Sequence, residues 1–271
     1  MIAAIVILYH PQTEEVLRNI RGFADAVDKV LIWRNSPESI DIPTDLRDKT
    51  VLLGRGENDY MAKPLNEALK WCEEQNCDYL LTMDQDSEWE DAIHFVSRAI
   101  SAAEPDVAIY APYVKGQYKK PEYDYDAESV ITSGSLVNVN TARKLGGFRE
   151  DYQIYWVDGE YCYWARKNGY KVRVLHDCAL IQKFGKQTKT LFGFTTSNYS
   201  PEVYYFLIRN MIWMRREFPQ GVSLKTIAYT LMFTTRGILL GEKNKFRKIH
   251  FINKAIVHGL FSRINKRSVL S

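Results

Sequence analysis

The first 110 residues alternate between short runs of β-branched and other apolar residues and longer stretches with apolar residues at helical spacing. The expected strands cover residues 2–9, 30–33, 50–53, 79–83 and 107–110, and the expected helices cover 13–26, 62–74 and 90–102. Such alternation is typical of βαβ units, whose strands lie parallel in one sheet with helices on its faces. It predicts an α/β fold with a Rossmann-like, mostly parallel sheet flanked by helices.

The remaining residues predict further elements of the same kind. A long polar and aromatic loop is expected at 113–128, a strand at 130–138, a short helix from Thr141 to the glycines at 146–147, and short strands at 171–175 and 178–182. Helices are expected at about 200–218, 223–241 and 245–266. Because loops as long as 113–128 are uncommon in compact domains unless they have a function, this one is a candidate part of a binding site.

Polar side chains stand where the expected strands end, at His10, Asn35, Asn58, and the pair Asp84 and Asp86. In open α/β sheets, ligands bind where the carboxyl ends of the strands emerge. Two carboxylates one residue apart can reach one Mg²⁺ or Mn²⁺ ion, which such sites usually share with substrate phosphates. The pattern predicts a nucleotide-diphosphate site with a metal. The alternative is an ordinary strand-to-turn junction, since Asp and Ser favour turns.

Two other nucleotide-binding motifs are missing. The chain contains neither Gly-x-Gly-x-x-Gly nor Gly-x-x-x-x-Gly-Lys-Ser/Thr after its strands, which disfavours dinucleotide-binding and P-loop proteins. Its four cysteines have no zinc-site spacing, and reduced thiols in a cytosolic protein are expected. No run of about 18 apolar residues predicts a membrane span, and residues 1–9 lack the basic region of a signal peptide.

A second group of acidic and aromatic residues lies at 155–164. Asp158 stands where a helix is expected to begin, and Glu160 follows in its first turn. Acidic residues there stabilise a helix, so Asp158 is either an N-cap or a general base held beside an aromatic wall. Arg209, in the helix at 200–218, is either a phosphate ligand or an ordinary arginine extending from the helix into solvent.

Charge is distributed unevenly along the chain. Residues 220–271 contain ten Lys or Arg and one acid, Glu242, for a charge of +9, so a whole-chain charge of +3 leaves −6 for residues 1–219. In 245–266, apolar residues at helical spacing are flanked by Lys and Arg. This predicts a helix that lies on an anionic membrane surface or one that packs its apolar face on the body. We therefore expect a domain at 1–218 and a basic amphipathic helical extension at 219–271.

Nine segments together resemble the family-2 glycosyltransferases with the GT-A fold, especially the rhamnosyltransferase-like branch. They occur in the family's order at residues 5–11, 33–36, 57–66, 81–87, 132–136, 146–148, 155–160, 167–171 and 204–210. The resemblance implies a GT-A domain and an inverting transfer of rhamnose or another hexose from a nucleotide-diphosphate sugar, dTDP- or UDP-linked. It also implies Mg²⁺ or Mn²⁺, and as acceptor a hydroxyl of a bacterial cell-surface glycan or lipid-linked saccharide.

The resemblance also assigns roles to residues. Asp158 would be the catalytic base and Asp86 a metal ligand, while the substrate would contact Pro11, Asn35, Asn58, Asn66, Asp84, Glu160 and Arg209. Such a protein would be cytoplasmic or peripheral at the inner face of the cell membrane, and nucleic acid is not an expected partner.

Two positions depart from the family's pattern. Gln182 stands where a metal-binding His is frequent; its carbonyl oxygen can also be a ligand, and His176 is a second candidate. Trp164 stands where an Arg is usual. These departures leave open an alternative function, a metal-independent or inactive glycosyltransferase-like module that binds a nucleotide or glycan.

Overall fold

The computed structural model describes residues 1–116, 119–182, 188–189 and 195–269. Within these residues, the main sheet has the strands β1 Ile2–Leu8, β2 Lys29–Arg34, β3 Thr50–Leu53, β4 Tyr79–Asp84, β5 Ser87–Trp89, β6 Val107–Val114, β7 Tyr125–Asp126, β8 Ser135–Asn138 and β9 Lys171–Gln182. Their order is β3-β2-β1-β4-β8-β6-β9-β5, with β7 paired to β9. A separate ribbon joins β10 Thr188–Lys189 and β11 Thr195–Thr196.

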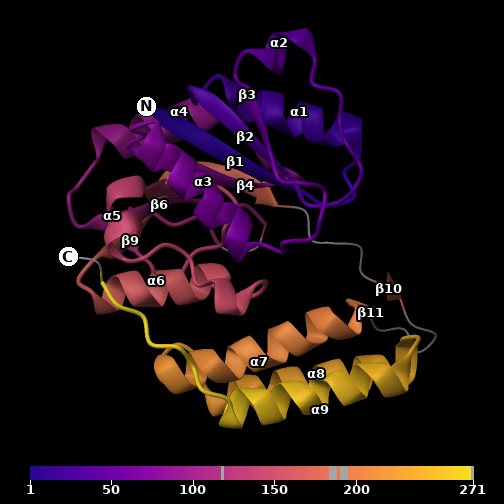
Figure 1. Cartoon of the computed structure of the whole chain (residues 1–271). Helices are drawn as coiled ribbons and strands as arrows, with labels where there is room; N and C mark the ends of the chain where they lie inside the picture. Colours follow the sequence, from indigo (N-terminus) through magenta and orange to yellow (C-terminus); the bar gives the residue numbers. More distant parts are fainter. Residues whose placement is uncertain (117–118, 183–187, 190–194, 270–271) are drawn as a thin grey trace.

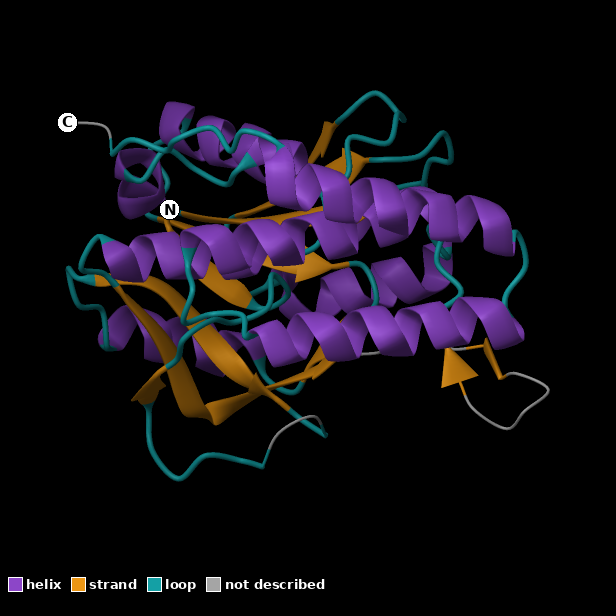
Figure 2. Ribbon diagram, turned by 90° about the horizontal axis from the view of Figure 1, so that it is seen from below, coloured by secondary structure: helices purple, strands orange, loops and turns teal. Residues whose placement is uncertain are grey.

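The helices are α1 Thr13–Ala24, α2 Thr44–Arg47, α3 Ala62–Glu74, α4 Ala92–Ser101, α5 Val139–Lys144, α6 Val157–Lys167, α7 Pro201–Glu217, α8 Leu224–Gly241 and α9 Lys245–Phe261, with a 3-10 turn η1 at Glu150–Tyr152. Helix α6 lies between the sheet and a layer formed by α7, α8 and α9 (Figure 1). In the view from below, the long helices lie in front of much of the sheet (Figure 2).

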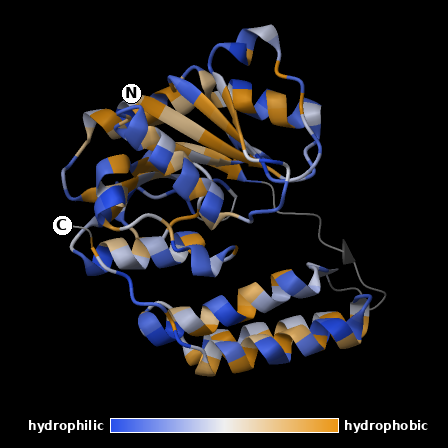
Figure 3. Ribbon diagram, in the orientation of Figure 1, coloured by the Kyte–Doolittle hydropathy of each residue, from blue (hydrophilic) through white to orange (hydrophobic). Residues whose placement is uncertain are grey.

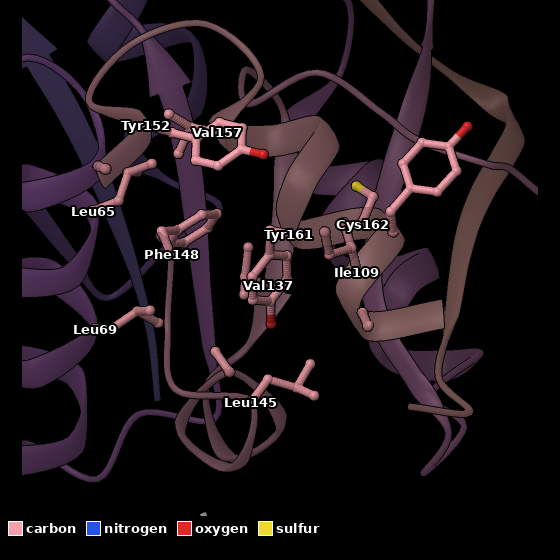
Figure 4. Packing of buried hydrophobic residues seen from close by; sticks show 14 of the residues in the cluster. Leu65, Leu69, Ile109, Val137, Leu145, Phe148, Tyr152, Val157, Tyr161 and Cys162 are labelled. Carbon is pink, nitrogen blue, oxygen red and sulfur yellow. The ribbon is translucent and has the colours of Figure 1, made fainter. Parts of the chain in front are cut away.

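The alternation of side chains along β1 builds two hydrophobic clusters, one on each face of the sheet. Ala4, Val6 and Leu8 join the cluster with α1 and α4, whereas Ala3, Ile5 and Ile7 join the cluster with α3, α5, α6 and α7. A strand buried on both faces is the expected result of a continuous apolar run. The second cluster includes Leu65 of α3, Phe148 and Tyr161 of α6, which come from three different segments (Figure 4).

The predicted α/β architecture is confirmed, but the sheet is less parallel than expected. Strands β1 to β4 pair in parallel, as do β6 and β9. Strand β8 runs antiparallel between β4 and β6, and β5 and β7 pair antiparallel with β9. Hydrophobic periodicity shows which faces of a strand are buried and carries no information on its direction, so the sequence could not show this reversal.

Strand β9 is continuous where two short strands were expected. Leu175 pairs with Pro112, and Ala179 pairs with the next residue, Tyr113. His176, Asp177 and Cys178 therefore form a bulge between the two pairs. Bulges re-aim side chains while a strand continues. The apparent break in the sequence pattern is this bulge.

The start of one helix and the strand before it also differ from prediction. Helix α5 begins at Val139, and its N-cap is Asn138, whose side chain accepts a hydrogen bond of 2.9 Å from the Thr141 amide. The strand before it is shorter than expected, because residues 130–134 form a turn in which Gly134 has φ +81°. A side chain at Gly134 would also approach Pro112 and Leu180 within 3.1 Å, so this turn favours glycine.

The apolar stripe of α9 packs on the body of the protein. Ile252 is buried, and Ile249 and Ile256 pack against the same cluster as α7, whereas Leu260 is exposed. The helix ends at Phe261, before the expected 266, and Ile264 packs against that cluster from the segment after it. Of the two predicted alternatives, membrane contact and packing on the body, most of the stripe therefore follows the second. The division of the chain at residue 218 remains a prediction. Among the described residues, no helix is both long and apolar enough to cross a bilayer.

Candidate functional site

The turn after β4 is fixed from both sides. Gln85 continues the β1–β4 pairing, because its side chain accepts from the Tyr9 amide and donates to the Tyr9 carbonyl, both at 3.0 Å. Asn19 of α1 donates to the Gln85 carbonyl at 2.9 Å. Asp84 and Asp86 flank this anchored residue. Gln85, the middle residue of the Asp-x-Asp motif, therefore anchors the turn, so that its two neighbouring carboxylates need not do so.

The Ser-Gly-Ser step before β8 contacts the same turn. Ser133 accepts a hydrogen bond of 3.1 Å from the Asp84 amide and donates one of 2.8 Å to the Ser87 hydroxyl. Thr132, one residue earlier, donates its backbone amide to Oδ2 of Asp158 at 3.1 Å. Adjacent residues of one turn thus contact the carboxylate of Asp158 and the backbone of Asp84. The turn at 132–133 connects the end of β4 with the start of α6.

Asp158 is not the N-cap of its helix. It is the second residue of α6, after Trp156 as N-cap, and its Oδ1 accepts from the Gly159 amide at 2.8 Å. Tyr155 and Trp156 have φ values of +61° and +64°, as does Gln153 at +58°. Such backbone conformations are unfavourable for non-glycine residues and persist only where the surroundings impose them.

Asn210 of α7 imposes this conformation. Its side chain is fully buried, and its Nδ2 lies 2.8–2.9 Å from the carbonyl oxygens of Tyr152, Ile154 and Tyr155. Arg209 in turn donates to Oδ1 of Asn210 at 2.7 and 2.9 Å. Sequence reasoning singled out Arg209 in this segment and missed Asn210. The only available signal was that a helix otherwise rich in apolar residues contains an amide.

Burial and mutual repulsion disfavour ionisation of the carboxylates at this edge. Burial raises the pKa of Asp84 to about 7, with further increases from the charges of Asp86 and Asp158. Burial also raises the pKa of Asp158, although hydrogen bonds from Gly159 and Thr132 oppose the shift. Asp84 and Asp86 thus lie close enough to Asp158, from a distant segment, for their charges to interact, and the roles assigned to the three residues remain predictions. A cation placed among them would reverse both pKa shifts.

Gln182 fits a metal site at the same edge. At the end of β9, its Nε2 donates to Oδ2 of Asp84 at 3.1 Å, so rotation of the amide would turn its oxygen toward the carboxylates. His176 lies on the β9 bulge and contacts Asp124 at 2.7 Å. Of the two candidates, Gln182 is therefore the one that contacts the Asp-x-Asp motif.

Among the described residues, the tight groups of three His, Cys, Asp or Glu ligands lie at the β9 bulge. They are His94, Asp177 and Cys178, and Asp124, His176 and Asp177. Arg98 already pairs there with Asp124 at 2.7 Å and with Asp177 at 3.6 Å. At the Asp-x-Asp motif, a metal would need oxygen ligands from a substrate as well. Mg²⁺ and Mn²⁺ commonly bind in this way, through one or two carboxylates and substrate phosphates.

Asn35 and Asn58 come together at the ends of β2 and β3. Asn35 is buried, and its Nδ2 lies 3.3 Å from Oδ1 of Asn58 and 2.9 Å from the Tyr60 carbonyl. Its Oδ1 accepts from the Asp59 amide at 2.7 Å. Pro11 follows the end of β1 at the same edge of the sheet and is partly exposed. The four predicted strand ends therefore share one edge. Their contacts with a nucleotide remain predictions.

Three other predicted substrate residues have partners within the protein. The side-chain amide of Asn66 binds the backbone of Phe148 twice. Its Oδ1 accepts from the Phe148 amide at 2.7 Å, and its Nδ2 donates to the Phe148 carbonyl at 2.8 Å. Arg209 is buried against Asn210 and stacks 4.1 Å from the centre of the Trp213 ring. Glu160 is buried and pairs with Arg267. These contacts support the framework of the site, and the proposed substrate contacts of all three residues remain predictions.

A cavity of about 670 Å³ lies on the Asp158 side of the site. Asp158 lines it together with Tyr113, Tyr125, Tyr155 and Trp156. Tyr113 and Tyr125 come from the segment 113–128, which the sequence predicted to be one long loop and marked as a candidate part of a binding site. In the structure Tyr113 lies in β6 and Tyr125 in β7. The sequence also marks a second segment, residues 183–200, as a source of side chains that set specificity, and this segment lies mostly outside the described residues. Apolar walls with a few convergent polar groups are typical of small-molecule sites.

The C-terminal tail supplies a counter-charge to the helix that carries Asp158. Nη1 of Arg267 lies 2.6 Å from Oε2 of Glu160, and its Nη2 donates to the Leu145 carbonyl at 2.8 Å. Arg149 is farther from Glu160, at 3.7 Å. Burial raises the pKa of Glu160 from its ordinary 4.5 to about 7, and the two arginines only partly offset this increase.

We expect Arg267→Gln to destabilise the protein in a pH-dependent way. Loss of the guanidinium raises the pKa of folded Glu160 further above its unfolded value, so stability falls as pH rises from about 4.5 through the folded pKa. Urea denaturation should show that the free energy of unfolding falls by about 2–3 kcal/mol at pH 8 and by less than about 1 kcal/mol at pH 5. Lys266→Gln, at an exposed neighbouring position, is the control. Equal losses at both pH values would mean that Arg267 acts through packing alone.

Comparison with known proteins places the fold among glycosyltransferases. No family model matches the chain. A dTDP-rhamnosyl transferase of Shigella flexneri, RfbF, is 22% identical over 280 residues, which cover 94% of this chain and 93% of that protein. This likeness confirms the resemblance to the rhamnosyltransferase-like branch.

Two solved structures share the fold. TarS 1–349 of S. aureus, in complex with UDP-GlcNAc, has a TM-score of 0.60 at 14% identity and covers 96% of this chain and 81% of that chain. The mannosyltransferase PcManGT from Pyrobaculum calidifontis, in complex with GDP-Man and Mn²⁺, has a TM-score of 0.58 at 14% identity. The match covers 97% of this chain and 76% of that chain. The chain has the predicted GT-A fold.

Proposed function

We propose that this chain, with its GT-A fold and its likeness to a dTDP-rhamnosyl transferase, is an inverting glycosyltransferase. It transfers rhamnose or another hexose from a dTDP- or UDP-linked sugar to a hydroxyl of a bacterial cell-surface glycan or lipid-linked saccharide. One observation carries the proposal. The turn at 132–133 hydrogen-bonds both the Asp158 carboxylate at the start of α6 and the Asp84 backbone at the end of β4, so the Asp-x-Asp pair lies near Asp158, which lines an aromatic cavity.

The two sides of the site suit donor and acceptor respectively. On the donor side, Asp86 and Gln182, with Asp84 beside them, would hold Mg²⁺ or Mn²⁺ on the diphosphate. The ion would offset charge on the leaving nucleotide. The Mn²⁺ and GDP-Man bound to the mannosyltransferase PcManGT support this assignment. Asn35 and Asn58 then face the nucleotide from the adjacent strand ends.

On the acceptor side, Asp158 acts as the general base. The acceptor sugar enters the cavity among Tyr113, Tyr125 and Trp156. Asp158 accepts the proton of the acceptor hydroxyl while the oxygen attacks the anomeric carbon from the face opposite the leaving diphosphate. Attack from the opposite face gives inversion at that carbon. The hydrogen bonds from Thr132 and Gly159 orient the carboxylate for this role.

The contact of Gln182 with Asp84 favours a second candidate function, a module that binds a nucleotide or glycan without metal. Nε2 of Gln182 donates to Asp84, so the amide places a hydrogen-bond donor where a metal would otherwise contact this carboxylate. A module that binds a nucleotide or glycan without metal would use this arrangement. Such a module would bind nucleotides equally well with and without Mn²⁺ and would not transfer sugar.

Calorimetric titration with dTDP, UDP and their sugars, with and without Mn²⁺, tests the proposal. We expect one nucleotide to bind, and to bind more tightly with Mn²⁺, because the metal links the diphosphate to Asp86 and Gln182. Binding that is indifferent to Mn²⁺, with no sugar transfer to any acceptor, favours the second function. Failure to bind any nucleotide contradicts the glycosyltransferase proposal and leaves a module that binds a glycan.

A further inference from the structure

Helix α8 exposes a face that is more apolar than its packed face. Its exposed large apolar residues, each 43–66% accessible, are Leu224, Tyr229, Met232, Phe233, Leu239 and Leu240. Only Gly237 and Ile238 of its 18 residues are fully buried. A helix in a globular protein normally turns its apolar stripe toward the core. Helix α8 packs Ile227, Leu231 and Ile238 against the core but exposes a larger number of apolar residues.

Helix α9 extends this exposed apolar surface. It lies beside α8 at the outer boundary of the molecule, where hydrophobic residues occur along both helices (Figure 3). Although most of its own stripe is packed, Phe246 is 95% exposed and Phe261 80% exposed, and Val257 and Leu260 are about half-exposed. We call the exposed residues of the two helices the α8–α9 surface. Apolar exposure on this scale marks an interaction site in most proteins.

The charges around the α8–α9 surface are positive. Helix α8 contains Lys225 and Arg236 and no acidic residue, and Lys243 follows it in an exposed position. The one acid in residues 220–271, Glu242, is buried and pairs with Lys248 at 2.7 Å. It therefore does not reduce the positive charge that the surface presents to a partner. The partner must be both apolar and anionic.

We infer that the α8–α9 surface docks on an anionic lipid membrane. Apolar residues would enter the boundary between headgroups and acyl chains, while the lysines and arginines contact anionic headgroups. A second copy of the chain fits less well, because a symmetric dimer would place this surface against itself and bring cations against cations. The structure thus assigns membrane contact to α8 together with the ends of α9, whereas the sequence pointed to the apolar stripe of α9.

Docking in this way has a consequence for the acceptor, which rests on the function proposed above. Helix α7 packs against both α8 and α9, and its Leu207 lines the cavity that contains Asp158. Packed helices lie about 8–10 Å apart. The cavity would then be separated from the membrane surface by one layer of helices. A saccharide that extends from a lipid anchor could reach it.

Vesicle flotation with the full chain tests the inference. The probes are vesicles of phosphatidylcholine alone and of phosphatidylcholine mixed equally with phosphatidylglycerol. We expect binding to the anionic vesicles at least tenfold stronger than to the neutral ones, and weaker binding as salt increases. Met232→Ser combined with Phe233→Ser, and separately Lys225→Gln combined with Lys243→Gln, should each reduce anionic-vesicle binding at least tenfold.

Matched controls come from exposed residues elsewhere. Leu52→Ser with Ile93→Ser removes two exposed apolar side chains from β3 and α4, and Lys70→Gln with Lys144→Gln removes two exposed charges. Neither pair should change vesicle binding. Equal binding to neutral and anionic vesicles overturns the inference, as does a dimer in solution that Met232→Ser with Phe233→Ser dissociates while no vesicle is bound.

Nucleotide titration of the same preparations separates this inference from the proposed function. The α8 variants should bind nucleotide like the unchanged protein, because α8 lies outside the site. If the unchanged protein binds anionic vesicles but no nucleotide, the glycosyltransferase proposal fails while the membrane surface stands. If the unchanged protein binds nucleotide but no vesicle, the membrane inference fails while the glycosyltransferase proposal stands.

Discussion

Asp158→Asn should reduce kcat about 1,000-fold or more while leaving the Kd for the nucleotide sugar within about twofold, since a positioned general base contributes about 10²–10⁴ in rate. The amide keeps the size of the carboxylate and an oxygen that can accept from the Thr132 and Gly159 amides. It cannot accept the acceptor's proton. The measurement is steady-state transfer together with calorimetric donor binding. A variant with near-normal turnover would remove Asp158 as the base.

Asp151→Asn is the matched control for this change. Asp151 lies in the same segment, and its carboxylate accepts from Asn265 at 2.8 Å and does not line the cavity. We expect its kcat to stay close to that of the unchanged enzyme. The pH profile gives a second readout. Because the base must be ionised, kcat should fall as pH falls through the pKa of Asp158, and this dependence should disappear from the residual activity of Asp158→Asn.

Asp86→Ala should weaken Mn²⁺-dependent binding of the nucleotide sugar by about 100-fold, because a metal contributes several kcal/mol to holding phosphate charge. The metal would lose a carboxylate ligand, while the nucleotide would keep its contacts at Asn35 and Asn58. We therefore expect the Mn²⁺-independent part of the binding to change little. Calorimetry with and without Mn²⁺ separates the two contributions.

Glu88→Ala is the matched control for Asp86→Ala. Glu88 lies two residues later, and its carboxylate pairs with Arg18 at 3.3 Å. Its removal deletes an acid from the same region without touching the proposed metal ligands. Equal effects of the two changes would point to a general loss of negative charge. Unchanged donor binding in Asp86→Ala would place the metal on other residues.

The strand ends of the site were predictable because they depend on local sequence. Each buried strand is a continuous apolar run that ends in a polar residue, and parallel strands bring their carboxyl ends to one edge. Asn35 and Asn58 therefore meet as expected. The segments that cross this edge were not predictable. Thr132 and Ser133 lie in a turn before β8, and the antiparallel direction of β8 brings that turn to the carboxylate of Asp158 and the backbone amide of Asp84.

The sequence by itself determined the α/β alternation, the doublet of Asp84 and Asp86, and the motifs that indicate a glycosyltransferase, because these depend on residues close together in the chain. Tertiary structure decided the direction of β8, the approach of Asp158 to Asp84, the clamp of Asn210 on the strained turn before α6, and the contact of Arg267 with Glu160. It also decided that α8 presents its apolar residues outward. The physical reason is that periodicity encodes which residues share a face, whereas the partner of that face depends on how distant segments pack.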